Sequence, residues 1–150
     1  MLFKKKPLLP PTVQEAVVAA IRAAEAKTTG EIRVFIESHC SFVDALDRAK
    51  EVFSNLSMEM TEERNAVLVY AALKDKQFAI FGDEEIYHKA GGQQFWERAA
   101  QLLQNGLRKG APDEGLVACI TELGNALGRH FPFKAEVDKN ELPDEIVFGK

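Results

Sequence analysis

The residues best suited to chemistry in this sequence flank two apolar runs, at 66–73 and 77–81. A Lys-Asp-Lys turn at 74–76 separates the runs, a pattern that predicts two antiparallel strands. The start of one strand and the end of its antiparallel neighbour lie on the same edge of a sheet. We therefore expect that edge to gather four polar residues, which are Arg64, Asn65, Asp83 and Glu84.

A fifth polar residue, Glu31, opens another strand pattern at 31–37, in which the β-branched residues Ile32, Val34 and Ile36 lie on one face. A helical pattern separates this strand from 66–73, which predicts a parallel connection between the two strands. Parallel strands start at the same side of a sheet, so Glu31 should join the other four residues. We call this edge the polar end of the sheet.

Hard cations such as Ca²⁺ and Mg²⁺ prefer oxygen ligands from carboxylates, amides and carbonyls. The expected metal ligands at the polar end are Glu31, Asn65, Asp83 and Glu84. Arg64 could bind a phosphate group of a substrate, or it could pair with a carboxylate. An alternative needs no ligand, because Asn65 and Asp83 could cap turns while Arg64 neutralises Glu63 or Asp83 at the surface.

Other reactive side chains lack the partners that catalysis needs. His39 and Cys40 are adjacent in sequence and point in different directions, so they do not form a thiol–imidazole pair on their own. His88 and His130 have no partner at the spacing of a zinc site. A glycine pair at 91–92 lacks the lysine and the hydroxyl of a phosphate-binding loop.

Composition favours one compact domain, because 150 residues with 46% hydrophobic content can bury a core without disulfides. The net charge of −4 and the scattered basic residues exclude nucleic acid as a partner. No apolar run is long enough for a membrane span or for the core of a signal peptide, so we expect a cytoplasmic protein without a transmembrane segment. Cys40 and Cys119 are expected to be free thiols.

Residues 1–11 are rich in lysine and proline, and we expect them to form a flexible leader before a single domain at 12–150. Capping patterns begin at Thr12 and at Ser41, and each precedes apolar residues at helical intervals. The same periodicity predicts helices at 93–109 and 112–130.

Three glycines in the last of these helices should permit close packing on the sheet. The tail after residue 131 is acidic and contains one short strand pattern, at 146–148. We expect this tail to be solvated and held in place by Val137, Leu142 and Ile146. Taken together, the elements predict a three-layer α/β/α sandwich with a small mixed β-sheet flanked by helices.

Several short blocks of the sequence resemble the TPM domain family, and the resemblance extends from Thr12 onward. The blocks are Thr-Gly-Glu-Ile-Arg-Val at 29–34, Arg-Asn-Ala-Val-Leu at 64–68, Phe-Ala-Ile-Phe-Gly-Asp at 78–83 and Phe-Trp at 95–96. The segment at 138–144 is similar to the tail of short bacterial members. The resemblance implies an α/β/α sandwich, in agreement with the periodicity.

The same resemblance implies two kinds of activity. Relatives include thylakoid-lumen proteins associated with photosystem II repair and reported as acid phosphatases, and others that look like accessory or cation-binding modules. Many relatives are exported and carry a membrane segment, and this sequence shows neither feature. Relatives often have glycine at the position of Ala66, so the backbone approach at that turn is expected to differ here.

Two functions follow as expectations. As a non-enzymatic accessory module, the protein would present the polar end to a protein partner and hold Ca²⁺ or Mg²⁺ there. As a metal-assisted phosphate-ester hydrolase of the acid phosphatase kind, it would use the cation to position a phosphoryl group and a water. We favour the binding module, because no set of nucleophile, base and orienting group can be assembled from the sequence.

Overall fold

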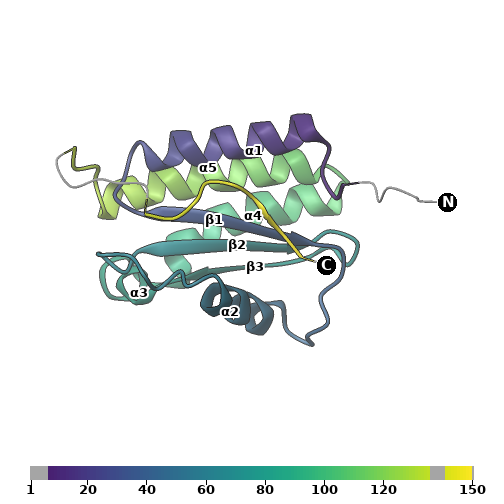
Figure 1. The fold of residues 1–150 in the computed structure, drawn as a ribbon, viewed down its shortest axis with the longest axis horizontal. Coiled ribbons are helices and arrows are strands. Elements are labelled where there is room, and N and C mark those ends of the chain that lie inside the picture. Colours follow the sequence, from purple (N-terminus) through teal and green to yellow (C-terminus); the bar gives the residue numbers. More distant parts are fainter. Residues whose placement is uncertain (1–6, 136–140, 150) are drawn as a thin grey trace.

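Four strands form one mixed sheet, in the order β3-β2-β1-β4 (Figure 1). The strands are β1 (Glu31–Glu37), β2 (Ala66–Ala72), β3 (Gln77–Gly82) and β4 (Val147–Phe148). β1 is parallel to β2 and to β4, whereas β2 and β3 are antiparallel. The computed structural model describes residues 7–135 and 141–149. The predicted strands and the mixed sheet are confirmed, with strand ends shifted by one residue.

Helices cover both faces of this sheet. Figure 1 shows α1, α5 and α4 over one face and α2 over the other, which confirms the predicted three-layer α/β/α sandwich. The five helices are α1 (Pro11–Glu25), α2 (Ala45–Asn55), α3 (Glu84–Ala90), α4 (Gln93–Arg108) and α5 (Pro112–His130). α2 connects β1 to β2 as expected for a parallel pair, and α3 follows directly after β3.

The central strand β2 carries the core of the protein. All seven of its residues are 0% exposed, because helices cover both of its faces. Val67 and Val69 pack in the cluster formed with α1, α4 and α5, while Leu68 and Tyr70 pack in the cluster formed with α2. The apolar run that the sequence shows therefore corresponds to a strand with two buried faces.

Two helix starts differ from the capping patterns of the sequence. α1 begins at Pro11 without a side-chain cap, because proline has no N–H to satisfy and its fixed φ suits the first turn. α2 is capped by Asp44, which accepts a hydrogen bond from the N–H of Leu46, so the predicted cap at Ser41 is wrong. Leu9 is buried in the core, so packing begins before Thr12.

Most described residues of the C-terminal tail are exposed, as the sequence predicts. Leu142 is buried and Ile146 packs against the core as expected, whereas Val137 lies outside the described residues. The tail ends against β1, where β4 pairs with it and the N–H of Gly149 donates to the carbonyl of Ile36. Acidic side chains of the tail also have protein partners, because the carboxylate of Glu141 accepts a hydrogen bond from the N–H of Glu62.

Glycines of α4 and α5 allow these helices to approach their helical neighbours. The prediction that the glycines of α5 permit close packing on the sheet is therefore wrong. A Cβ placed on Gly106 would lie 2.5 Å from the Cα of Gly115, and a Cβ on Gly124 would lie 2.5 Å from the Cβ of Ala24. The neighbours are helices, because α5 lies between α1 and α4 and packs against both.

We expect Gly106→Ala to destabilise the protein by ~2 kcal/mol, because the new methyl meets backbone atoms of α5 that cannot move independently. Helix propensity alone predicts the opposite sign, a gain of about 1 kcal/mol. The free energy of unfolding in urea measures the effect. Gln104→Ala, at an exposed position of the same helix, is the control and should change stability by less than about 0.5 kcal/mol. A stabilised Gly106→Ala would contradict the close contact.

Candidate functional site

The three strand ends converge as the sequence predicts. Glu31 at the start of β1 lies opposite Ala66 at the start of β2, and Gly82 at the end of β3 lies opposite Val67. The N–H of Asp83 donates to the carbonyl of Ala66 over 2.9 Å, which continues the ladder by one residue. The polar end is therefore a real feature of the fold, with all five predicted residues at or next to it.

Arg64, Asp83 and Glu84 form one cluster at the polar end. The Arg64 guanidinium binds Asp83 through two hydrogen bonds, Nε to Oδ2 over 2.7 Å and a terminal nitrogen to Oδ1 over 2.9 Å. Its other terminal nitrogen lies 3.4 Å from a carboxylate oxygen of Glu84. Asp83 also caps α3 by accepting from the N–H of Glu84. These contacts match the alternative in which Asp83 caps a turn and Arg64 neutralises it.

The exposure of this cluster is uneven. The Asp83 side chain is 6% exposed, whereas the Arg64 and Glu84 side chains are 39% and 54% exposed. Arg64 has a positive φ of 52°, in the left-handed region that ordinary residues seldom adopt. Its carbonyl accepts a hydrogen bond from the N–H of Glu85, which holds this turn against α3. The guanidinium thus lies over the end of the sheet, with solvent on its outer side.

Asn65 is turned toward β1 and away from that cluster. It is 0% exposed, and its Nδ2 donates to Oγ1 of Thr29 over 3.2 Å. The Oδ1 atom of Asn65 is also buried and has no hydrogen-bond partner among the described residues. An unpaired buried amide oxygen is costly, so this atom is a candidate acceptor or ligand.

Glu31 lies under the C-terminal tail. It is 1% exposed, and Oε1 accepts a hydrogen bond from the N–H of Leu142 over 2.7 Å. Burial raises the pKa of the Glu31 carboxyl to about 7, although the Leu142 N–H opposes the shift, and the charges of Glu141 and Asp144 raise it further. Glu31 therefore has its own partners, apart from Asp83 and Glu84.

A half-buried acidic residue that the sequence prediction missed, Glu25, lies in the last turn of α1. Its Oε2 accepts from the N–H of Ile32 over 2.8 Å. Burial, and next a hydrogen bond with the Asp144 carboxyl, raise the pKa of Glu25 well above its usual range. The sequence did contain a signal for the burial of Glu25, because this residue lies four positions after Ile21, on the apolar face of the predicted helix.

The predicted metal ligands thus occupy three separate environments. Asp83 and Glu84 surround Arg64, Asn65 bonds Thr29, and Glu31 bonds the tail. Within residues 7–135 and 141–149, no three His, Cys, Asp or Glu side chains are grouped as in a metal site. Of the three predicted carboxylate ligands, the structure brings two together, Asp83 and Glu84, which both contact Arg64.

The opposite end of the sheet holds a second polar network. The carboxylate of Glu37 accepts two hydrogen bonds from Arg48 and one from the hydroxyl of Tyr70. Burial would raise the pKa of Glu37, but these hydrogen bonds outweigh it and hold the pKa below its usual range. Nearby, Asp75 binds Nδ1 of His39 and the N–H of Cys40, each over 2.8 Å. This network ties the β2–β3 turn to the end of β1.

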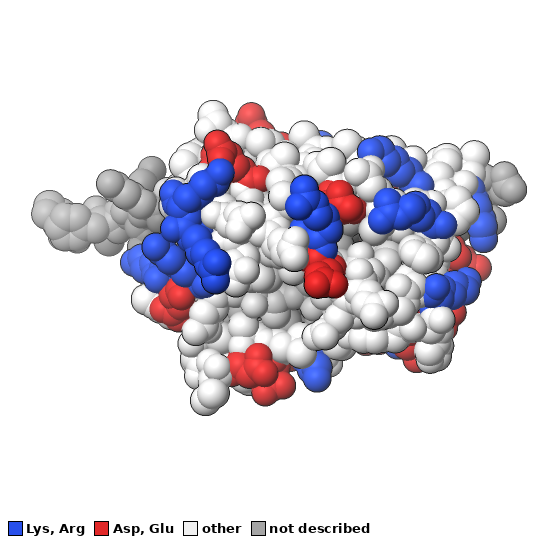
Figure 2. All heavy atoms as spheres, turned by 180° about the vertical axis from the view of Figure 1, so that it is seen from behind, with Lys and Arg blue, Asp and Glu red and all other residues white. Residues whose placement is uncertain are grey.

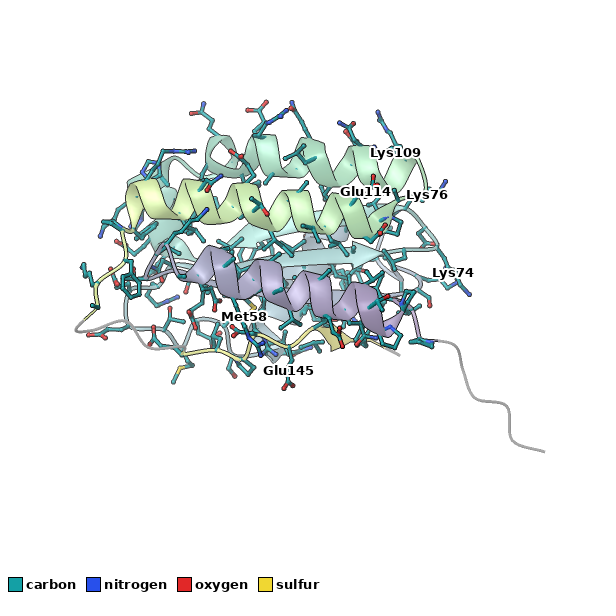
Figure 3. All side chains as sticks on the ribbon, turned by 90° about the horizontal axis from the view of Figure 1, so that it is seen from above. Met58, Lys74, Lys76, Lys109, Glu114 and Glu145 are labelled. Carbon is teal, nitrogen blue, oxygen red and sulfur yellow. The ribbon has the colours of Figure 1, made fainter. Side chains whose placement is uncertain are left out.

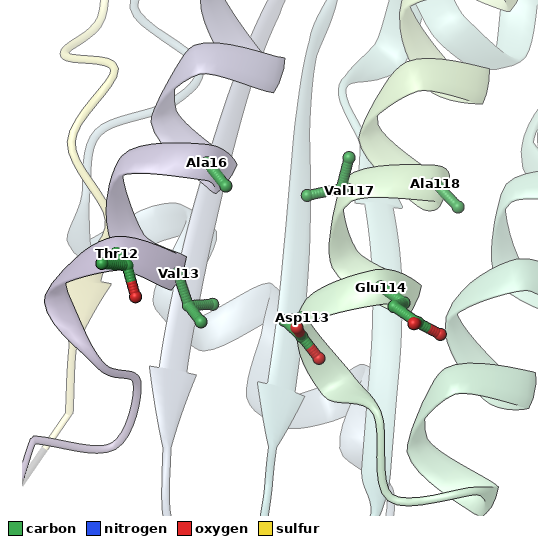
Figure 4. A pocket seen from close by; sticks show the side chains of 7 residues that line it. All are labelled: Thr12, Val13, Ala16, Asp113, Glu114, Val117 and Ala118. Atoms are coloured by element: carbon green, nitrogen blue, oxygen red, sulfur yellow. The ribbon is translucent and has the colours of Figure 1, made fainter.

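A shallow groove lies between the N-terminal halves of α1 and α5, away from both networks (Figure 4). Its volume is about 520 Å³, and apolar side chains from the two helices face each other across it. The lining residues are Thr12, Val13, Ala16, Asp113, Glu114, Val117 and Ala118. The groove contains two carboxylates and one hydroxyl, which do not form a catalytic group. It also lies away from the polar end.

Two comparisons place the chain among known proteins. The sequence model of the TPM domain matches residues 3–126. The BA42 protein from the psychrophilic bacterium Bizionia argentinensis is 40% identical over 97% of this chain and 99% of its own, with a TM-score of 0.88. The N-terminal domains of cg2496 from Corynebacterium glutamicum and of a P. gingivalis protein share the fold at 14% and 13% identity, with TM-scores of 0.64 and 0.61. The first covers 84% of this chain and 86% of its own, the second 85% and 83%.

A small mixed sheet between two helical layers, with a polar end where the parallel strands start, defines a compact α/β/α domain. The chain belongs to the TPM domain family. A comparison with curated proteins finds no match. In the described ranges, no helix combines the length and the apolar character needed to span a membrane.

We expect the Glu31 carboxyl to make stability depend on pH. Between its ordinary pKa of 4.5 and about 7, the unfolded chain releases this proton while the folded protein keeps it, so the free energy of unfolding falls as pH rises. Glu31→Gln keeps an oxygen acceptor for Leu142 and removes the titration. Relative to wild type, the variant should gain up to ~3 kcal/mol as pH is raised from below 4.5 to above 7.

Urea unfolding across that pH range measures the difference. Glu114→Gln, whose side chain is 68% exposed, is the matched control and should follow the wild-type profile. Parallel profiles for wild type and Glu31→Gln would show that burial does not perturb this carboxyl.

Proposed function

We propose that this protein is a non-enzymatic binding module of the TPM domain family that takes a divalent cation, Ca²⁺ or Mg²⁺, at the polar end of its sheet. Asp83 and Glu84 supply the first carboxylate ligands. The observation that carries the proposal is the position of Arg64, whose guanidinium lies between these two carboxylates. One positive charge thus already occupies the place that a cation would take.

A divalent cation can replace the guanidinium for a simple electrostatic reason. It carries twice the charge of Arg64 and accepts several oxygen ligands at once. Arg64 sits in a turn rather than within a helix or strand, and its side chain is partly exposed, so it can swing into solvent without breaking a regular element. Asp83 is held in place by the N–H of Glu84, which keeps one ligand fixed.

The remaining predicted ligands have distinct roles in the proposal. Asn65 offers the unpaired oxygen Oδ1 next to Arg64 in the chain, as a further ligand if its side chain turns. Glu31 would first have to release the N–H of Leu142, so we assign the cation to Asp83 and Glu84 before Glu31. Arg64, once displaced, is free to pair with an acidic group of a protein partner.

Binding is better supported than catalysis at this point of the fold. Arg64 and Asp83, the side chains that would orient a phosphate and a metal, satisfy each other through two hydrogen bonds. In such a pair a divalent cation can replace the guanidinium of Arg64. Hydrolysis would also need a positioned water and a group to activate it.

Titration with Ca²⁺ and Mg²⁺, followed by amide NMR, tests the proposal. We expect the amides of residues 64–66 and 82–85 to shift together, and the unfolding midpoint to rise, because the cation binds the folded state. Asp83→Asn should abolish both effects. Arg64→Gln should tighten cation binding, because it removes the competing charge.

Asp113→Asn, in the first turn of α5, is the matched control and should bind as wild type does. The proposal fails if millimolar Ca²⁺ and Mg²⁺ leave the amides of 64–66 and 82–85 in place, or if Arg64→Gln weakens binding. Metal-dependent hydrolysis of a phosphate ester that disappears in folded Asp83→Asn would instead favour the hydrolase.

A further inference from the structure

The second candidate surface is the lateral edge of β3, the outermost strand on one side of the sheet. β3 has β2 as its only strand neighbour among the described residues, so its other side lacks a partner. We define the β3 edge as the outward backbone of residues 77–82. It differs from the polar end, which lies where β3 stops.

The hydrogen-bond register shows which backbone groups point outward. The N–H of Asp83 donates to the carbonyl of Ala66, so these two residues form a bonded pair of the antiparallel ladder. Bonded pairs alternate along such a ladder. The N–H and C=O groups of Phe78, Ile80 and Gly82 therefore face away from β2, and no hydrogen bond within the described residues involves them.

Natural sheets protect such edges with charged residues, prolines, bulges or a covering element. β3 has no charged residue, proline or bulge, because its sequence is Gln-Phe-Ala-Ile-Phe-Gly and its pairing with β2 is continuous from 77 to 82. Ala79, Ile80 and Gly82 are nevertheless buried, because neighbouring helices cover part of this strand. Phe78 and Phe81 are each partly exposed, one on each face of the sheet. An added strand would find apolar contacts for its side chains on both faces.

The shape of the surface favours a single strand over a whole domain. Seen from behind, the molecule has a hollow among uncharged atoms, with charged side chains of both signs beside it (Figure 2). α2 packs on β3 from one layer, and α4 packs on it from the other. A narrow extended segment can enter between α2 and α4. A second copy of the domain would instead bring its own helices against α2 and α4.

Charge at the two ends of β3 specifies which end of an added antiparallel segment is basic, and antiparallel pairing is the more stable of the two. Lys74 and Lys76 are exposed beside its start, and both project from one end of the molecule (Figure 3). Asp83, Glu84 and Glu85 lie beside its end, where Arg64 contacts the first two and Nδ1 of His88 lies 3.0 Å from a carboxylate oxygen of Glu85. A segment antiparallel to β3 places its N-terminal side at the acidic end and its C-terminal side at the lysines.

We propose that the β3 edge binds an extended segment of a partner protein by β-strand addition. The segment runs antiparallel to β3, has basic residues on its N-terminal side, alternating apolar residues in its middle and acidic residues on its C-terminal side. Main-chain hydrogen bonds to Phe78, Ile80 and Gly82 supply the affinity, and the terminal charges supply the selectivity. This inference does not rest on the cation proposal.

Two synthetic peptides of identical composition test the polarity. Each has Val-Thr-Val-Thr-Val between two arginines and two glutamates, with the arginines at the N-terminus in the first peptide and at the C-terminus in the second. The full chain is titrated in EDTA, so that cation binding at the polar end plays no part. The first peptide should slow amide exchange at Phe78, Ile80 and Gly82 and bind about fivefold more tightly than the second.

Lys76→Glu should weaken binding of the first peptide by about fivefold, and a third peptide with lysines in place of the glutamates should restore it. Lys27→Glu, at the exposed end of α1, makes the same change of charge elsewhere and should leave binding unchanged. Equal binding of both peptides, or binding without protection of the three amides, would overturn the proposal. Protection that rises with protein concentration alone would assign the edge to a second copy of this chain instead.

Discussion

The burial of β2 on both faces is the constraint on which the rest of the structure depends. Its residues alternate between two different volumes, with Val67 and Val69 on one side and Leu68 and Tyr70 on the other. A slip of one residue would exchange these faces and misplace the Tyr70 hydroxyl, which bonds Glu37. Because β1 and β3 pair with this strand, its register also fixes their positions, and the polar end lies where this strand begins.

Buried carboxylates in this fold are stabilised in two different ways. Asp83 and Glu37 are each bound by an arginine through two hydrogen bonds. Glu31 accepts a backbone N–H but has no paired base, and burial moves its pKa upward. The tail therefore rests on β1 over a carboxyl that holds its proton more firmly than an exposed one, whereas the hydrogen bonds from Arg48 and Tyr70 hold the pKa of Glu37 below its usual range.

The polar end and the β3 edge share the residues that follow β3. Glu84 lies beside Arg64 at the polar end, and it also belongs to the acidic end of the β3 edge. A cation bound by Asp83 and Glu84 would lower the negative charge available to a basic residue of an added segment. The two surfaces are thus linked through electrostatics over a short distance, without any change of the fold between them.

The sequence by itself determined the strands and the helices, because periodicity is a local property of the chain. The convergence of Glu31, Asn65 and Asp83 at one edge also depended on the order and direction of the strands, which belong to the tertiary structure. Only the tertiary structure decided what those side chains contact. Arg64 reaches Asp83 from nineteen positions away, and Glu31 meets Leu142 across more than a hundred residues. The same holds for Glu25, whose unusual carboxyl results from the packing of the tail over α1 and β1. Burial and pairing of charges depend on which distant segments meet, and no local pattern contains that information.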